Sequence, residues 1–329
     1  MAKIFHVRWS AIKTFRRCQK KYDYNWRQNI ERRKPATPLI RGTILGQCID
    51  EMVEGKSFEP VLARYEKQYG KLFKDEQEEY GDLIGECRRI VNNYIDRYKD
   101  DGLTYLPGKN KEHHEIAVET RFEVDGVRVK FTGHIDKMPR DKEGHILVMD
   151  HKSHKVIPDE GARYNDLQLI TYLWLLPLSG FEPAVGVLWD YLRTKPPTVP
   201  EVLKNGSLTV RKNIDTDYAT YLQAIRDNGL DPADYRETLN RLKAEGTDNY
   251  FLRVKIPSPP KAMIENMIID FKDTIAEMIN SEKTGRFTRN MSKDCSWCGM
   301  YSLCQAELRG LDSSFIRKAD YAERKEDDR

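Results

Sequence analysis

The chain has 329 residues, of which 39% are hydrophobic and 33% charged, and its formal net charge is +3. These values are typical of a globular protein with a polar surface and with one large domain or two smaller ones. A membrane protein is excluded, because the most apolar stretch, residues 167–178, is too short and too polar to cross a bilayer. The start of the chain also lacks the apolar segment of a secretory signal, so we expect a cytoplasmic protein, in which clustered cysteines bind metals more often than they form disulfides.

The first 34 residues are strongly basic, with eleven Lys and Arg against two acidic residues. Ser10 fits a helix N-cap, and the residues after it predict a helix up to Cys18 with Ile12 and Phe15 facing inward. The basic and aromatic residues that follow have two interpretations: a solvated helix face with core anchors, or a surface that contacts phosphates and stacks bases. These residues are Arg16, Arg17, Lys20, Lys21, Tyr22, Tyr24 and Trp26.

A break at residues 35–38, which contain two prolines, precedes a helix that starts at Arg41. Residues 59–100 predict two helices with acidic faces, and we interpret them as an insertion that covers a sheet. Cys48 and Cys87 fall in helical patterns without a spaced partner, so we expect them to be small core residues.

The centre of the chain predicts three strands. The first covers residues 115–122 and ends before a hairpin turn at residues 125–126. The second begins with residues 127–131, which alternate with period two. After a turn at residues 141–144, residues 146–149 are apolar at every position, as expected of a buried central strand.

Charged residues follow two of these strands. Asp136 follows the second strand, and Asp150 and Lys152 follow the third. Period two puts Asp150 and Lys152 on one face, and pairing of the strands brings Asp136 alongside. Two carboxylates and an ammonium group that converge at a sheet end can hold a divalent cation and activate a water against a phosphate.

Tyr164, Gln168 and Tyr172 recur every four residues and predict one helix whose polar face points toward these charges. An ordinary amphipathic helix with a polar stripe is the alternative. The remaining pattern predicts a strand at residues 185–192, helices at about 215–228 and 231–245, and a long helix at about 260–282.

Cys295, Cys298 and Cys304 form a C-x₂-C-x₅-C run that is one ligand short of a tetrahedral site, and Cys18 is the spare thiol. Four thiolates suit either an iron–sulfur cluster or zinc. Structural zinc generally uses paired C-x₂-C knuckles, and only one knuckle is present, so we favour a cluster over zinc.

The motifs Gly-x-x-Asp, Asp-x-Lys and Gln-x-x-x-Tyr, which end at Asp136, Lys152 and Tyr172, resemble the nuclease core of the RecB-like branch of the PD-(D/E)XK superfamily. The resemblance implies an α/β fold, with a restriction-endonuclease-like core of a mixed central sheet flanked by helices. In that family the two acids hold Mg²⁺ or Mn²⁺, the lysine positions or activates the attacking water, and the Gln/Tyr helix supports the site and contacts DNA. The catalytic residues that the resemblance implies are Asp136, Asp150, Lys152, Gln168 and Tyr172.

The same family usually has Arg-Gly-Thr-x-x-His in an earlier helix, and its histidine is a metal ligand. This chain keeps the arginine, as Arg41, but has Gly46 in the histidine position. Asp50 lies one helical turn further on and matches a position that is often acidic, so Asp50, Gln47 or water would complete the metal shell. The resemblance also implies that the backbone carbonyl of His151 contacts the metal.

One distant N-terminal cysteine with three C-terminal ones is similar to the iron–sulfur members of the family, such as the AddB-type recombination nucleases and the CRISPR-adaptation nucleases. In those proteins four thiolates hold a [4Fe–4S] cluster that joins the ends of the chain around the nuclease core. The resemblance implies the same role for Cys18, Cys295, Cys298 and Cys304, with Zn²⁺ as the alternative.

The resemblance therefore implies one nuclease domain at residues 1–310, with helical insertions at about 56–104 and 193–250 and a charged extension at residues 311–329. The expected activity is a metal-dependent DNA nuclease, more an exonuclease than an endonuclease, that acts on DNA ends or single-stranded DNA in recombination, repair or phage DNA processing. The host would be a bacterial or phage-infected cell, and recombination or replication proteins are the expected protein partners. The residues expected to bind DNA are Arg16, Arg17, Lys20, Lys21 and Arg41.

Two alternatives from other classes stay open. Because Gly46 replaces the histidine, the protein could be a catalytically degenerate homologue that binds DNA ends as a recombination or packaging partner. An iron–sulfur redox sensor that regulates transcription is the other alternative, but the sequence has no helix-turn-helix signature to support it.

Overall fold

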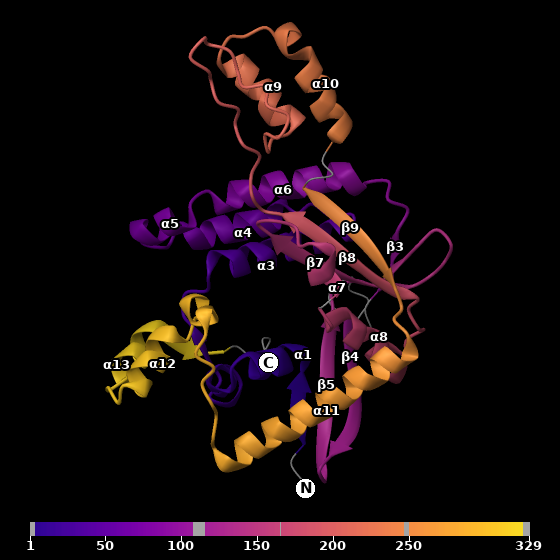
Figure 1. Ribbon diagram of the computed structural model, residues 1–329, viewed down its shortest axis with the longest axis vertical. Coiled ribbons are helices and arrows are strands. Elements are labelled where there is room, and N and C mark those ends of the chain that lie inside the picture. The colour runs from indigo at the N-terminus through magenta and orange to yellow at the C-terminus, as the bar shows by residue number, and fades with distance from the viewer. Residues whose placement is uncertain (1–3, 108–115, 165, 247–249, 325–329) are drawn as a thin grey trace.

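The computed structural model describes residues 4–107, 116–164, 166–246 and 250–324. Two three-stranded sheets form its centre, and helices flank them (Figure 1). The fold is therefore a mixed α/β fold, as the sequence predicts. None of the helices in these ranges is long and apolar enough to cross a membrane.

In the first sheet, β5 (Val127–Ile135) is the central strand. It pairs in parallel with β1 (Phe5–Arg8) and antiparallel with β4 (Ile116–Val124). The hairpin turn between β4 and β5 is confirmed: Asp125 and Gly126 have φ angles of 49° and 72°. A tight turn whose two central residues both have positive φ matches the twist of the strands that it joins.

In the second sheet, β8 (Gly186–Arg193) is the central strand. It pairs in parallel with β7 (Leu147–His154) and antiparallel with β9 (Phe251–Pro257). β7 is longer than the apolar run predicts, so Asp150 and Lys152 lie within the strand and not after it. Helices cover both faces of β7 and β8, which explains why the first three residues of β7 and most of β8 are apolar without alternation.

The two sheets meet at a short bridge and do not share a continuous ladder. Backbone hydrogen bonds of 2.9 and 3.2 Å join Lys137 to Met149. Beside this bridge, β3 (Thr104–Tyr105) pairs with β6 (Pro139–Arg140). The predicted turn at residues 141–144 is confirmed by a hydrogen bond of 3.0 Å from the N–H of its last residue to the carbonyl of its first.

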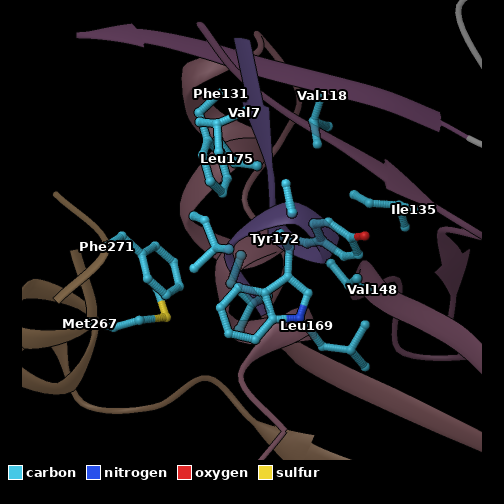
Figure 2. Close-up of a cluster of buried hydrophobic side chains, with 14 of the residues drawn as sticks. Val7, Val118, Phe131, Ile135, Val148, Leu169, Tyr172, Leu175, Met267 and Phe271 are labelled. Carbon is cyan, nitrogen blue, oxygen red and sulfur yellow. The ribbon is translucent and has the colours of Figure 1, made fainter. Parts of the chain in front are cut away.

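One face of the sheets packs on α8 (Gln168–Leu178) and α11 (Lys261–Thr284). α11 confirms the predicted long helix. Figure 2 shows how side chains from these helices meet the strands in one apolar core. Its labelled members are Val7, Val118, Phe131, Ile135, Val148, Leu169, Tyr172, Leu175, Met267 and Phe271.

The predicted start of the first helix is wrong. α1 (Trp9–Arg17) follows β1 directly, and its N-cap residue is Arg8, which makes no side-chain cap. Trp9 is buried with its ring centroid 5.2 Å from that of Phe271. The helix therefore begins at a residue that packs against α11, and Ser10 does not cap it.

The expected helix that carries Tyr164 and Gln168 on one face is also two helices. α7 (Glu160–Tyr164) ends before α8 begins, and the side chain of Tyr164 lies outside the described residues. The carboxylate of Asp166 accepts a hydrogen bond of 3.1 Å from the N–H of Gln168. An aspartate that satisfies a free N–H in a first helical turn favours a new helix start there.

The opposite face of the second sheet is covered by a helical layer with a second core. Cys48 and Cys87 are buried in this core, as expected. Its first helix begins four residues earlier than predicted because Pro38 is accepted in a first helical turn. Residues 59–100 form three helices where two were expected, and Gly81, with a φ of 57°, ends the middle one. The helices are α3 (Thr37–Val53), α4 (Glu59–Tyr69), α5 (Lys74–Tyr80) and α6 (Leu83–Tyr98).

A small helical module projects beyond α6 (Figure 1). It contains α9 (Tyr218–Asp227), the 3₁₀ helix η2 (Pro232–Tyr235) and α10 (Arg236–Glu245), which confirm the two predicted helices. The module has its own core, in which Tyr221 is fully buried.

The two ends of the chain pack together. β10 (Tyr321–Glu323) pairs antiparallel with β2 (Ile30–Arg32), so part of the expected charged extension is folded onto the domain. Tyr24 and Leu303 are fully buried in a small core between these ends. The other elements are α2 (Gln19–Tyr22), the π-helical turn η1 (Asp23–Arg27), η3 (Lys293–Trp297), α12 (Tyr301–Leu308) and α13 (Ser314–Asp320).

Candidate metal centre

Asp136 lies at the edge of β7 that faces away from β8. The bridge between Lys137 and Met149 holds the segment after β5 against β7. The backbone N–H of His151 donates a hydrogen bond of 2.9 Å to Oδ2 of Asp136. Because the N–H and C=O of one strand residue point to the same side, the carbonyl of His151 also faces the side of Asp136.

Asp150, Lys152, Gln168 and Tyr172 form a connected network on one face of β7. Nζ of Lys152 lies 2.7 Å from Oδ2 of Asp150 and 3.3 Å from Oε1 of Gln168. The side-chain N–H of Gln168 donates to Oδ1 of Asp150 at 3.0 Å and to the Tyr172 hydroxyl at 3.2 Å. The structure therefore brings together the four side chains that the Asp-x-Lys and Gln-x-x-x-Tyr motifs predict to meet.

Gly133 allows Tyr172 to approach β5. A Cβ atom at this glycine would lie 2.6 Å from Cε1 of Tyr172, closer than real Cβ contacts. The close approach of Tyr172 thus explains why the Gly-x-x-Asp motif has a glycine here, since any side chain would displace the ring.

The charges at this site are unbalanced. Burial raises the pKa of Asp150, and the charge of Asp136 raises it further, to about 7, although Lys152 lowers it. Burial lowers the pKa of Lys152, but the charges of Asp150 and Asp136 outweigh this effect and raise it. Close carboxylates that resist full ionisation are relieved by a cation, and their oxygen atoms suit Mg²⁺ or Mn²⁺. The donor set therefore fits a divalent metal.

A groove of about 870 Å³ lies beside these residues, between α3 and the strands. Asp136 and His151 line it from the sheet, and Gly46 and Asp50 line it from α3. No atom lies within 4 Å of the position that a Cβ of Gly46 would occupy, so the place of the histidine that the RecB-like resemblance implies is open space. Asp50 forms an ion pair with Lys137, which is 98% buried.

A second polar row crosses the sheet on the other face of β7, and the sequence did not predict it. Nδ1 of His151 lies 2.7 Å from Oδ2 of Asp190 on β8, and Nε of Arg253 on β9 donates to Oδ1 of Asp190 at 3.1 Å. The hydroxyl of Tyr94 on α6 also donates to Asp190. Burial lowers the pKa of His151, but the hydrogen bond and charge of Asp190 outweigh this and raise it. A charged residue within the apolar run of β8 was the available sequence signal.

Two of the basic residues expected to bind DNA are engaged within the protein. Arg16 donates to Oγ1 of Thr274 at 2.9 Å and to the carbonyl of Asp270 at 2.7 Å. Lys20 forms ion pairs with Asp23 at 2.8 Å and with Glu307 at 3.5 Å. Both side chains thus help to hold the first helices against the C-terminal half of the chain.

The other three residues expected to bind DNA have different surroundings. Arg17 forms an ion pair that is largely exposed to solvent. Lys21 lines an open pocket together with Trp297, whose side chain is exposed. Arg41 donates to Glu86 at 2.6 Å and is mostly buried.

The four cysteines that were predicted to act together surround one small pocket between the end of α1 and α12. In the described part of the chain, no three of their sulfur atoms lie within 4.8 Å of one another. Tetrahedral zinc, with Zn–S bonds of about 2.3 Å, would hold thiolates roughly 3.8 Å apart. The thiols are therefore more widely spaced than a zinc site requires.

Three other ligand atoms do lie within 4.8 Å of one another, in the turn before β7. They belong to Asp141, Glu143 and His145, of which the last two are exposed. A hydrogen bond and ion pair with Lys255 lower the pKa of Asp141 to about 2. We assign no metal site to this acidic turn, because surface carboxylates gather in this way without binding a metal.

Two mixed sheets whose junction brings two carboxylates and a lysine together have an arrangement that suits a metal-dependent nuclease. The family model of the PD-(D/E)XK nuclease superfamily matches residues 8–305, and the chain belongs to this superfamily. Nucleases of this superfamily use divalent metals, so membership indicates a phosphodiesterase with DNA as its substrate.

Two solved structures show only distant similarity. The chain is 14% identical to SSO0001, with a TM-score of 0.33 over 80% of this chain and 84% of the other. It is 11% identical to Rai1 of Scheffersomyces stipitis, with a TM-score of 0.17 over 73% of each chain. No curated protein matches the sequence.

Proposed function

We propose that the protein is a divalent-metal-dependent DNA exonuclease of the RecB-like branch. Asp136 and Asp150 would hold the metal, and Lys152 would act beside it. The observation that supports this proposal best is the network in which Gln168 fixes both Asp150 and Lys152, with Asp136 at the adjoining edge of β7.

Each member of the network has a separate task in the proposed reaction. Asp136 and Asp150 would hold Mg²⁺ or Mn²⁺, which would polarise the scissile phosphate and lower the pKa of a bound water. The ammonium group of Lys152 orients that water and offsets the negative charge that develops on the phosphate. Gln168 fixes the ammonium group relative to Asp150, and Tyr172 fixes the amide of Gln168.

Two further groups belong to the proposed metal site. The backbone carbonyl of His151 faces the side of Asp136 and would be one ligand. Asp50 would be another, but its ion pair with the buried Lys137 would have to open first. This ion pair makes Asp50 a weaker candidate than the sequence resemblance implies.

The proposed substrate is a DNA end or single-stranded DNA, which would reach the site past Arg17, Lys21 and Arg41. Arg16 and Lys20 would act indirectly, because their contacts hold the helices that carry the exposed cations. Recombination, repair or phage DNA processing is the proposed setting, with recombination or replication proteins as partners.

The proposed cofactor of the cysteines is a [4Fe–4S] cluster. Its irons stand at the corners of a cube, so its thiolates lie farther apart than those around one zinc ion. The wide spacing of the thiols around a shared pocket supports a cluster. Iron, sulfide and zinc analysis of anaerobically purified protein tests this assignment, and stoichiometric zinc without iron would contradict it.

The experiment for the activity compares end-labelled linear single- and double-stranded DNA with circular single-stranded DNA, each with Mg²⁺, Mn²⁺ or chelator. We expect metal-dependent loss of the linear DNA alone. Asp150→Ala and Lys152→Ala should abolish cleavage while the fold stays intact. Asp141→Asn is the matched control, because it removes a carboxylate from the acidic turn and should leave cleavage unchanged. Full activity of Asp150→Ala would refute the site.

The open space at Gly46 supports a second candidate function, a homologue that binds DNA ends without cutting them. Such a protein would hold DNA in the presence of chelator and would never degrade it after addition of Mn²⁺. Absence of cleavage with every metal, together with retained DNA binding, would favour this candidate over the nuclease.

A further inference from the structure

Trp297 is the most exposed large hydrophobic side chain in the described part of the chain. Its side chain is 89% exposed, and it lies between Cys295 and Cys298 at the end of η3. Tryptophan is highly buried on average in folded proteins, because its ring carries much apolar surface. A ring that is presented to solvent in this way marks a surface that binds something.

The backbone that carries Trp297 is held firmly although the ring is exposed. Oγ of Ser292 accepts a hydrogen bond of 3.3 Å from the N–H of Asp294 and caps η3. After the ring, the carbonyl of Gly299 accepts a hydrogen bond of 2.9 Å from the hydroxyl of the buried Tyr321. An aromatic ring on a fixed backbone offers a large contact area and loses little conformational entropy on binding.

The ring borders a groove of about 740 Å³ between the first helices, the start of α3 and η3. Leu39 of α3 lines the groove and is 67% exposed, and Trp26 of η1 adds further apolar surface. Aromatic and aliphatic side chains that line an open groove suit a planar, partly apolar ligand.

Cations border the same groove. Lys21 and Arg32 line it, and neither forms a hydrogen bond or an ion pair within the described residues. The stem of Arg32 lies against the segment after the ring, since a Cβ at Gly299 would be 3.3 Å from Cδ of this arginine. The carboxylate of the groove, Glu31, pairs with its third cation, Arg324, at 3.8 Å. An exposed aromatic ring beside free cations matches a nucleotide, which combines a planar base with a charged phosphate.

The helix α3 connects this groove with the candidate metal site. Leu39, Thr43, Gly46 and Asp50 are three or four residues apart, so they share one face of the helix. Leu39 lines the groove at Trp297, and the other three line the groove at the metal site. The rise from Leu39 to Gly46 and Asp50 is about 10 to 16 Å along the helix axis, or roughly three to five nucleotides of a stacked strand.

We propose that this groove binds one nucleotide of single-stranded DNA, with the base stacked on Trp297 and a phosphate held by Lys21 and Arg32. The inference rests on the proposed function, of which it uses the single-stranded DNA substrate, and adds a subsite roughly three to five nucleotides from the metal site. Bases inside a duplex are already stacked on both faces, so only an unpaired strand can use the ring. The groove therefore favours single-stranded over double-stranded DNA.

The direct test is the binding of fluorescently labelled oligothymidylate to the full-length protein in chelator, where cleavage cannot interfere. Trp297→Ala should weaken binding about 5- to 150-fold, the usual effect of removing one stacking ring, and should leave the affinity for duplex DNA unchanged. Trp297→Phe should recover most of the affinity, because a phenyl ring also stacks on a base. Phe315→Ala is the matched control: Phe315 is 79% exposed on α13, lies outside the groove and should not affect binding.

A single abasic site that is moved along the oligonucleotide locates the stacked base. With wild-type protein, the abasic site should weaken binding most at one position. At that position it should have little effect on binding to Trp297→Ala, because the ring and the base belong to one interaction. The first bond cleaved after addition of Mg²⁺ should lie roughly three to five nucleotides from this position.

The outcomes separate this inference from the proposed function. Unchanged single-strand affinity of Trp297→Ala, in a protein that still cleaves DNA, would refute the subsite and leave the nuclease intact. Equal losses of affinity for single strands and duplexes would also refute it, since the ring would then not select unpaired bases. A wild-type dimer that Trp297→Ala converts to monomers of unchanged DNA affinity would assign the ring to an interface between copies. Single-strand binding that depends on Trp297, without cleavage by any metal, would keep the subsite and refute the nuclease.

Discussion

Gly133→Ala should destabilise the protein through one contact. The new Cβ would lie 2.6 Å from Cε1 and 3.0 Å from Cδ1 of Tyr172, and 3.3 Å from a methyl group of Leu175. Tyr172 is 5% exposed and belongs to the core in Figure 2, so its ring has little room to move. Overpacking of a filled core costs about 1–3 kcal/mol, and we expect the free energy of unfolding to fall by that amount.

Denaturant titration of purified variants measures this change, and Gly46→Ala is the matched control. Gly46 lies within α3, and a Cβ there meets no atom within 4 Å. Replacement of a glycine inside a helix by alanine stabilises by about 0.5–1 kcal/mol when nothing clashes. The two Gly→Ala changes should therefore have opposite signs.

A double-mutant cycle isolates the clash. Tyr172→Ala removes the ring and should cost about 3–5 kcal/mol, because it leaves a cavity in the core. In that background Gly133→Ala should cost much less than in the wild-type protein, since the two closest atoms that it meets are gone. An equal cost of Gly133→Ala in both backgrounds would refute the steric account of the glycine.

Three further predictions concern other parts of the chain. Cys298→Ser should remove the proposed cluster and lower the melting temperature; a colourless variant of equal stability would show that the cluster does not hold the ends of the chain together. Burial raises the pKa of Asp23, but hydrogen bonds from Lys20 and Arg27 outweigh this effect and lower it. The ionised carboxylate therefore stabilises the folded protein at every pH above the unfolded pKa of about 3.9. This stabilisation is lost as the pH falls through the lower pKa of the folded state. Acid titrations of Asp23→Asn should lack that step. Lys21→Gln should weaken DNA binding and reduce its salt dependence, whereas Arg16→Gln should mainly lower stability.

The sequence predicted most of the candidate site because its motifs are local. Asp150 and Lys152 are two residues apart on one strand, and Gln168 and Tyr172 are one turn apart on one helix, so each pair shares a face whatever the tertiary structure. Only the structure shows how the two pairs come together. Gln168 joins them through its hydrogen bonds with Lys152 and Asp150.

The predictions from the sequence were wrong where tertiary contacts determine the local structure. The start of α1 is accompanied by burial of Trp9 against α11, which is more than 250 residues away in the sequence. The pairing of β10 with β2 joins the two ends of the chain, and neither segment has a strong strand pattern. The basic residues showed the same limit: the sequence could not indicate that Arg16 contacts α11 while Lys21 borders an open pocket.

The polar row of His151, Asp190 and Arg253 explains how β7 keeps its register. Residues 147–149 are apolar on both faces and fully covered, so their pattern would tolerate a shift of one residue. Such a shift would move Asp150 to the face of α6 and would bury charges without partners, at a cost of several kcal/mol. The row pairs each charge only in the observed register, and that register also points Asp150 and Lys152 toward Gln168. The buried network on one face of the sheet thus fixes the geometry of the metal site on the other.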